Sequence, residues 1–296
     1  MNKNAFFGTS TWTYPGWEGI VYRDVSSYGR QFKSECLSEY ARSELFDCVG
    51  IDSTFYGVPS EPFLANLRRQ LPSGFPCVFK VPREISSPRF TRSFGPKGSA
   101  GNLNPHFLNP VRLREGMLKI CREFIPGNEG LFVMQFPTLR QEDIQGGKWL
   151  ECLDYLLGEL GGEWPIGVEI RNPELLTPGY FEVLSAHRAT HMFQVWTGMP
   201  LPHDVLARFP ESIRCSDLVG CRALVRPGLL YSDAVEKYAP YSRLVDPAPQ
   251  IRESILTLVR EAELLNKAVI TTVNNRLEGC APLTIQALRE DLRGGQ

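Results

Sequence analysis

Glu169 and Arg171 stand two residues apart in the stretch IGVEIRNPE, residues 166–174. In a β-strand, whose side chains alternate with a period of two, Val168 and Ile170 face one side while Glu169 and Arg171 face the other. Burying an unpaired ion is costly, so both charges need a partner or water. One interpretation is a mutual ion pair in a layered core. The other is the floor of a polar pocket at a strand end, where a barrel enzyme places its chemistry.

The composition is typical of a soluble globular protein. The 296 residues are 43% hydrophobic and carry a formal net charge of -1, so nucleic acid or acidic lipid would need a local basic patch. The sequence has no run of about eighteen apolar residues, and MNKNAFFGTS lacks a signal peptide's apolar core, so we predict a cytoplasmic protein with no membrane contact. The eight cysteines form no CxxC pair and are expected to be reduced core residues.

Strand-length apolar runs recur along the chain, and each is followed by a possible helix. The predicted strands are 5–10, 48–54, 77–82, 131–137, 165–171, 190–195, 222–226 and 268–274. The predicted helices are about 31–45, 61–71, 111–125, 147–161, 178–187, 202–209, 249–265 and 282–292. This alternation predicts an α/β fold, a closed (β/α)8 TIM-type barrel, with an open doubly wound sheet as the alternative.

No linker and no internal repeat divides the chain, so a single domain over 1–296 is expected. Two connections, 11–29 and 83–110, are longer than the usual loops of α/β units. We expect them to lie over the C-terminal face of the barrel, where such loops carry the site or its lid.

Alternation along each predicted strand also indicates which side chains point into the barrel mouth. Every strand offers a polar residue near its C-terminal end, provided that no β-bulge shifts the phase. These residues are Ser10, Asp52, Thr54, Lys80, Gln135, Glu169, Arg171, Gln194, Arg226 and Asn274. The convergence of eight strands supports a polar site better than any single residue does.

Several segments, in this order, resemble one protein family. They are GTSTWTYPGW (8–17), IDSTFYGVPS (51–60), FKVPREIS (79–86), FVMQFP (132–137), VEIRNP (168–173), RPG (226–228) and VNNRLEGCAP (273–282). Together they are similar to the YecE-like proteins, the family called domain of unknown function 72. The resemblance implies a TIM-type barrel, distantly similar in shape to xylose-isomerase-like and endonuclease IV-like barrels, and it implies no activity. The chain departs from the family pattern at Pro227, where a histidine usually stands, and at Val273, which is usually aromatic.

Lys80, Glu169 and Arg171 form the core of the functional hypothesis. A glutamate flanked by cations would serve as general acid or base, and Lys80 with Arg171 would clamp a carboxylate or phosphate. The structural alternative is a buried charge network that only closes the top of the barrel.

The other candidate residues each have a structural alternative as well. Trp12 and Tyr14 could stack against a sugar or base, or could simply exclude water. Asp52 could be a second carboxylate opposite Glu169, or could accept hydrogen bonds from an arginine. The remaining predicted ligand contacts are Tyr56, Gln135, Arg226, Asn274 and Asn275. The amides of Asn274 and Asn275 could recognise hydroxyl groups or a base edge, or could instead satisfy loop backbone.

The sequence gives little support for a metal or a cofactor. The histidines are His106, His187, His191 and His203, and the helical pair His187 and His191 falls on the entry side of the barrel, so no zinc cluster is expected. A Mg²⁺ held by Asp52 and Glu169 stays an alternative. The motifs GxGxxG, GxxxxGK[ST], GxSxG and HExxH do not occur, so we expect no cofactor.

The leading prediction is an enzyme, a hydrolase or an isomerase, that acts on a small polar or anionic substrate such as a sugar or a phosphorylated metabolite. The first alternative is a nucleic-acid-binding or endonuclease IV-like repair protein, because the second long loop carries Arg83, Arg89, Arg92 and Lys97. The second alternative is a barrel that binds without catalysis.

Overall fold

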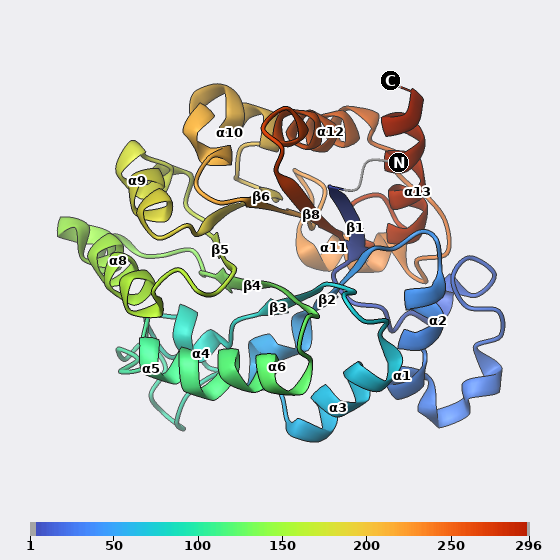
Figure 1. Cartoon of the computed structure of the whole chain (residues 1–296), viewed down its shortest axis with the longest axis horizontal. Coiled ribbons are helices and arrows are strands. Elements are labelled where there is room, and N and C mark those ends of the chain that lie inside the picture. The colour runs from blue at the N-terminus through green and yellow to red at the C-terminus, as the bar shows by residue number, and fades with distance from the viewer. Residues whose placement is uncertain (1–3, 295–296) are drawn as a thin grey trace.

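The barrel is closed by eight parallel strands that pair in sequence order, with β8 returning to β1 (Figure 1). The computed structural model describes residues 4–294. The strands are β1 (Ala5–Thr9), β2 (Cys48–Ile51), β3 (Cys77–Lys80), β4 (Glu129–Gln135), β5 (Ile166–Glu169), β6 (Thr190–Val195), β7 (Leu218–Ala223) and β8 (Ala268–Val273). The predicted TIM-type barrel is confirmed. The expected domain limits of 1–296 stay a prediction, since residues 1–3 and 295–296 lie outside the described part.

Strand β7 differs from the prediction, because it begins at Leu218 and ends at Ala223 rather than covering 222–226. Gly220 weakens the local strand signal. The structure needs that glycine, since a Cβ at this position would lie 2.2 Å from Sδ of Met192. Met192 on β6 also fills the space above Gly167 of β5, where a Cβ would lie 2.6 Å from the same sulfur atom. The glycine that makes the strand hard to predict from its own sequence is therefore the residue that lets Met192 pack inside the barrel.

Helices surround the barrel on its outside (Figure 1). They are α1 (Phe32–Glu35), α2 (Leu37–Arg42), α3 (Glu61–Gln70), α4 (Arg83–Ser86), α5 (Pro110–Leu113), α6 (Lys119–Phe124), α7 (Gln141–Ile144), α8 (Lys148–Leu160), α9 (Pro178–Ala186), α10 (Pro202–Arg208), α11 (Tyr231–Tyr238), α12 (Pro249–Leu264) and α13 (Ala281–Gly294). A π-helical turn at Arg114–Leu118 joins α5 to α6. The eight predicted helices are all found, although 31–45 is divided into α1 and α2, and 111–125 into α5, the π-helical turn and α6. The short helices α4 and α7, and the longer α11, were not predicted.

Local sequence explains where several helices begin. The side chain of Ser60 accepts a hydrogen bond from the backbone N–H of Phe63 at the start of α3, and Thr177 does the same for Tyr180 at the start of α9. Such caps satisfy backbone donors that the first helical turn leaves free. A proline also stands in the first turn of both helices, where its missing N–H costs nothing.

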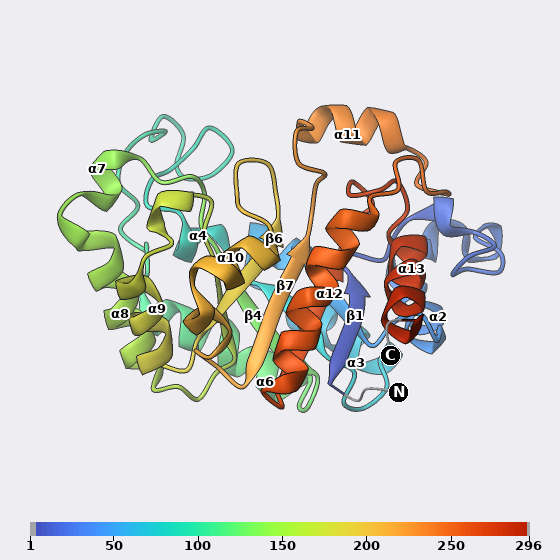
Figure 2. The ribbon, with the colours of Figure 1, turned by 90° about the horizontal axis from the view of Figure 1, so that it is seen from above.

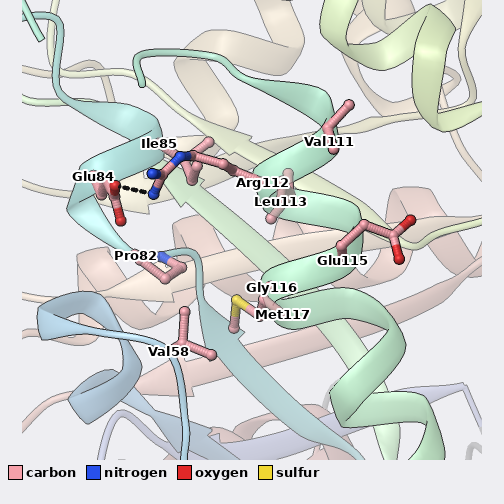
Figure 3. Close-up of a pocket in the computed structure, with 10 residues that line it drawn as sticks. All are labelled: Val58, Pro82, Glu84, Ile85, Val111, Arg112, Leu113, Glu115, Gly116 and Met117. Carbon is pink, nitrogen blue, oxygen red and sulfur yellow. Dashed lines mark hydrogen bonds and ion pairs between the residues drawn. The ribbon is translucent and has the colours of Figure 1, made fainter. Parts of the chain in front are cut away.

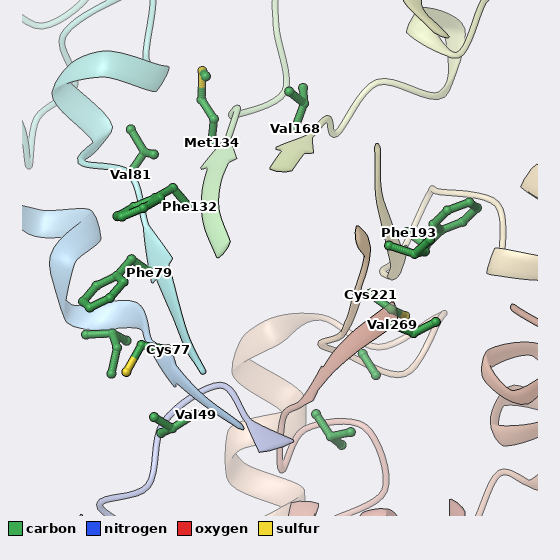
Figure 4. Close-up of a cluster of buried hydrophobic side chains, with 14 of the residues drawn as sticks. Val49, Cys77, Phe79, Val81, Phe132, Met134, Val168, Phe193, Cys221 and Val269 are labelled. Atoms are coloured by element: carbon green, nitrogen blue, oxygen red, sulfur yellow. The ribbon is translucent and has the colours of Figure 1, made fainter. Parts of the chain in front are cut away.

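Two apolar layers build the core. Strand residues that turn away from the barrel axis, such as Phe79, Phe132 and Phe193, pack against the helices (Figure 4). A smaller cluster fills the barrel interior with Cys48, Val78, Leu131, Val133, Met192 and Ile270. The interior is therefore a packed core rather than a pore, and polar side chains take over only toward the C-terminal strand ends.

The cysteines largely follow the prediction. All eight are free, and seven are buried, whereas Cys152 on α8 is exposed. Burial raises the pKa of the thiols of Cys121 and Cys221 to about 12, so these groups stay protonated at neutral pH. Among residues 4–294, no helix combines the length and the apolar character needed to cross a membrane.

The C-terminal strand ends carry the additional structure. Helices α7 and α11 and the loop after α4 lie at this end of the barrel (Figure 2). The segment 11–29 follows β1 and contains a 3-10 turn at Pro15–Trp17. These segments frame the barrel mouth.

Candidate functional site

A cavity of about 340 Å³ lies at the barrel mouth. Lys80 ends β3, and Arg222 lies near the end of β7. Asp52 directly follows β2, and Arg171 lies two residues beyond the end of β5. Parallel strands bring these ends together at one face. The polar side chains that line the cavity are Thr11, Asp52, Ser53, Tyr56, Lys80, Gln135, Arg171, Arg222, Tyr231, Asn274 and Arg276.

Glu169 and Arg222 form a buried ion pair at the floor of the mouth. Glu169 is fully buried, and its Oε2 accepts a hydrogen bond from Nη1 of Arg222 at 2.7 Å. Its Oε1 accepts one from Nη2 of Arg171. Arg222 also donates to Oε1 of Gln135 and to Oδ1 of Asp52, both at 3.0 Å. One carboxylate thus holds two guanidinium groups in place.

The charges of this network shift one another's pKa. Burial by itself would raise the pKa of Glu169, but attraction to Arg171, Arg222 and Lys80 outweighs burial and lowers it to about 2. Burial would lower the pKa of Arg222, and attraction to Glu169 and Asp52 raises it instead. The glutamate is therefore ionised at neutral pH and bonded on both oxygens.

Lys80 has a different environment. Its side chain is 12% exposed, and Nζ lies 4.0 Å from Oδ1 of Asp52 and 4.5 Å from the ring centroid of Phe55. Burial lowers the pKa of Lys80 to about 8, assisted by Arg222 and Arg171, while Asp52 and Glu169 oppose the shift. A lysine with such a pKa can exchange a proton near neutral pH.

Aromatic rings support three of the cations at the mouth. Lys80 lies over Phe55, the guanidinium of Arg171 lies 4.0 Å from the ring centroid of Trp196, and that of Arg276 lies 4.1 Å from the ring centroid of Tyr231. Cation–π contacts of this kind fix the orientation of a charged group while its N–H donors stay available. All three rings line the cavity.

The family model described as protein of unknown function DUF72 matches residues 6–296. The chain belongs to the DUF72 family. This confirms the resemblance to YecE-like proteins. The UPF0759 protein YecE of Escherichia coli (strain K12) is 27% identical over 177 residues, which is 59% of this chain and 51% of that relative. The match therefore spans about half the length of the relative.

Solved structures of the DUF72 family have the same fold. A DUF72 protein from Enterococcus faecalis V583 has a TM-score of 0.66 at 18% identity, covering 98% of this chain and 95% of that chain. One from Thermotoga maritima MSB8 has a TM-score of 0.64 at 17% identity, covering 98% and 99%. At these identities the likeness shows the fold alone.

In this DUF72 chain the mouth gathers most of the predicted site residues. Asp52, Tyr56, Lys80, Gln135, Arg171 and Asn274 line the cavity. Tyr56 is 73% exposed at the rim, with the guanidinium of Arg83 over its ring. Asn274 also accepts a hydrogen bond from the backbone N–H of Arg276 through Oδ1.

Trp12, Tyr14 and Asn275 are not on the cavity lining. Trp12 is buried, and Tyr14 is half-buried against Trp17 and Tyr241. Oδ1 of Asn275 accepts from the indole N–H of Trp17 at 3.2 Å and from the backbone N–H of Ala281 at 2.8 Å. These residues anchor the first long loop to the barrel in this structure.

Arg226 lies beyond the end of β7, and its Nη1 donates to the backbone oxygen of Asp246 at 2.7 Å. The predicted boundary of strand seven was wrong, and the arginine at the end of that strand is Arg222. Positions 222 and 226 are four residues apart, so both would point inward in a strand, and alternation alone could not choose between them. Sequence reasoning also missed Phe55, Trp196, Tyr231 and Arg276, although Arg276 directly follows the two asparagines that it singled out.

The histidines take part in separate contacts. Nε2 of His187 pairs with Asp154 at 2.6 Å, while Nδ1 of His191 lies 3.1 Å from the hydroxyl of Tyr180. Within residues 4–294, no group of three or more His, Cys, Asp or Glu side chains is arranged to hold a metal. Asp52 and Glu169, the suggested Mg²⁺ ligands, both accept hydrogen bonds from Arg222.

The arginine-rich loop is largely engaged in its own packing. Nη2 of Arg83 donates to the backbone oxygen of Ser93 at 2.6 Å, and Nε of Arg89 pairs with Asp143 at 2.9 Å. Arg92 and Lys97 are exposed.

A second cavity, also of about 340 Å³, lies beside α4 and the π-helical turn (Figure 3). We call it the side cavity. Its lining is mainly apolar and includes Val58, Ile85 and Met117, and the ion pair between Glu84 and Arg112 lies at its edge. Glu84 also lies 3.7 Å from Nε2 of His106.

Proposed function

We propose that the barrel mouth binds a small anionic ligand, such as a phosphorylated or carboxylated metabolite, and that the protein is an enzyme acting on it. The observation that carries this proposal is the charge of the mouth. Among the described residues of the mouth, Lys80, Arg171, Arg222 and Arg276 oppose two carboxylates, Asp52 and Glu169, which leaves a net charge of +2 when all are ionised. Arginine and lysine donors in such a cavity suit carboxylate and phosphate oxygens.

The residues divide into holding and reacting groups. Glu169 is fully buried and bonded by two guanidinium groups, so its proposed role is to position Arg171 and Arg222. This differs from the acid–base role expected from the sequence. The proton-transfer pair is instead Lys80 with Asp52, whose side chain is 31% exposed and lies 4.0 Å away. Such a pair suits either hydrolysis or isomerisation.

Anion binding is tested by thermal unfolding in sodium phosphate against sodium chloride at equal ionic strength. A ligand that binds only the folded state stabilises it by mass action, so phosphate should raise the unfolding temperature. Lys80→Met should reduce that shift. Lys119→Met is the matched control, because it removes the same charge from an exposed site, where Lys119 at the start of α6 pairs with Glu115 of the π-helical turn.

The proposal would be overturned if phosphate raised the unfolding temperature equally in Lys80→Met and Lys119→Met. It would also be overturned if phosphate left the unfolding temperature of the original protein unchanged. The nucleic-acid alternative and the non-catalytic alternative stay predictions. The first requires retention of DNA or RNA that weakens steeply with salt. The second requires anion binding without turnover of any substrate.

A further inference from the structure

We propose that Lys80 is a nucleophile that forms a Schiff base with a carbonyl compound bearing a carboxylate or phosphate group. This inference deepens the proposed function and rests on it, because the anionic group of the substrate would be held by the arginines of the mouth. It also narrows the substrate class to aldehydes and ketones.

The amino group of Lys80 is placed in the cavity without a hydrogen-bond partner. Among the described residues, Nζ donates no hydrogen bond, and it forms an ion pair with Oδ1 of Asp52 at 4.0 Å. The ring centroid of Phe55 lies 4.5 Å from Nζ. Lysine carries three donors, so a mostly buried amine that uses none of them is free to meet a ligand.

The surrounding groups favour a neutral amine, which is the nucleophilic form. The charged groups that act on Lys80 are Asp52 after β2, Glu169 and Arg171 at the end of β5, and Arg222 on β7. Burial and the two arginines favour loss of the proton, and burial is the largest effect. Desolvation beside other cations is a known way to activate a lysine amine.

The substrate's anionic group has a separate place to bind. Arg171 is fixed by Trp196 and Glu169, and Arg276 is fixed by Tyr231. Nε of Arg276 is buried and has no hydrogen-bond partner among the described residues. Both guanidinium groups line the same cavity as Lys80, so a substrate bound there through its anionic group would have its carbonyl group in the cavity that the amine lines.

The step balances without a further reactant. Lys80 in its ammonium form first gives one proton to Asp52 or solvent, and the neutral nitrogen attacks the carbonyl carbon. A C–N bond forms while the C=O π electrons move to oxygen, and the nitrogen's proton passes to that oxygen to give a carbinolamine. The first proton then returns to the hydroxyl, which leaves as water as the C=N⁺ bond forms. Overall, an ammonium and a carbonyl give a protonated imine and one water.

Borohydride trapping tests the proposal on the full chain. The protein is incubated separately with pyruvate, dihydroxyacetone phosphate and acetone, and sodium borohydride is added to reduce any imine to a stable secondary amine. Intact mass and peptide mapping then locate the adduct. We expect at least tenfold more adduct on Lys80 with an anionic carbonyl than with acetone, which has no anionic group.

Two variants accompany the trapping experiment. Lys80→Arg keeps the positive charge and removes the nucleophile, so it should abolish the adduct, whereas Lys119→Arg should retain it. The extent of trapping in the original protein should rise between pH 6 and 8 as the amine loses its proton. Mapping the adduct in the original protein locates it even if Lys80→Arg folds poorly.

Adducts spread evenly over surface lysines, or unchanged in Lys80→Arg, would overturn the Schiff-base proposal. So would the absence of a Lys80 adduct with both anionic carbonyls while phosphate still raises the unfolding temperature. That second result would leave the proposed anion site standing. Loss of the phosphate effect as well would remove both proposals.

Discussion

The barrel mouth and the side cavity have the same volume of about 340 Å³ but opposite chemistry. At the side cavity, Glu84 meets Arg112 at 2.5 Å and His106 at 3.7 Å, Glu115 pairs with Lys119, and apolar side chains form most of the remaining lining. At the mouth, cations outnumber carboxylates and the amine of Lys80 has no hydrogen-bond acceptor among the described residues. Volume therefore does not distinguish the two cavities as binding sites, whereas unmatched charge does.

The two cavities also differ in how their ion pairs are solvated. The side chains of Glu169 and Arg222 are 0% and 3% exposed, whereas those of Glu84 and Arg112 are 33% and 49% exposed. A buried pair strongly destabilises the fold when one partner is removed, because the other charge is left uncompensated. An exposed pair contributes little. The predictions below test this contrast.

The largest effect is expected for Glu169→Gln. A neutral amide would leave Arg171 and Arg222 buried without their shared carboxylate, so we expect a loss of about 3–5 kcal/mol in the free energy of unfolding. Glu84→Gln makes the same chemical change at the side cavity and should cost less than about 1 kcal/mol. Urea unfolding at pH 7 measures both, and equal losses would contradict the contrast.

The second effect is a pH dependence that belongs to Lys80. Its pKa is about 8 in the folded protein and about 10.4 in an unfolded chain, so between these values the unfolded state binds more proton. The stability of the original protein relative to Lys80→Met should therefore rise with pH across this window, by at most about 3 kcal/mol. Below pH 8 the penalty for burying the charged amine is fully present.

This pH effect is measured as the difference between two urea titrations at each pH from 7 to 10. The contributions of groups that both proteins share, such as the cysteines and tyrosines, cancel in the difference between the two free energies of unfolding. A difference that stays level, or falls, over this range would show that the amine of Lys80 is well solvated. Lys119→Met provides the surface control.

The third effect separates stability from binding. Met117 is 1% exposed and lines the side cavity, so Met117→Ala removes buried apolar surface and should cost about 2 kcal/mol. The phosphate-induced rise in unfolding temperature should stay as it is in the original protein, because the charges at the mouth are untouched. A phosphate effect that disappears with Met117→Ala would mean that the side cavity takes part in anion binding.

The sequence predicted the polar mouth because alternation along a strand is a local property. Lys80, Glu169 and Asp52 could each be placed on the inward face from their own segment alone. Where a strand ends cannot be predicted from this alternation. Arg222 and Arg226 share one face, and the pairing of β7 with β6 and β8, which stops at Ala223, shows that the strand carries Arg222.

The supporting rings were beyond sequence reasoning for a related reason. Trp196 follows β6 and Tyr231 begins α11, yet each lies against an arginine from another part of the chain. Nothing local to a tryptophan or a tyrosine indicates which cation it will support. The same limit applies to Glu169, for which the sequence predicted an acid–base role. Its two arginine partners and its complete burial arise only when the barrel closes, so its own segment does not indicate the positioning role that we propose.

The smallest effect concerns Arg276, which can be matched with Arg112 at the side cavity. Arg276 is half-buried and contacts the ring of Tyr231, so Arg276→Gln should change the free energy of unfolding by less than about 0.5 kcal/mol. It should nevertheless weaken phosphate binding by about 1 kcal/mol, or roughly fivefold, because one charge-assisted donor is lost from the cavity. Arg112→Gln removes the same charge from an ion pair that already satisfies it, so phosphate affinity measured by calorimetry should stay the same. Equal affinities in all three proteins would place the anion away from Arg276, beside the other cations of the mouth, Lys80, Arg171 and Arg222.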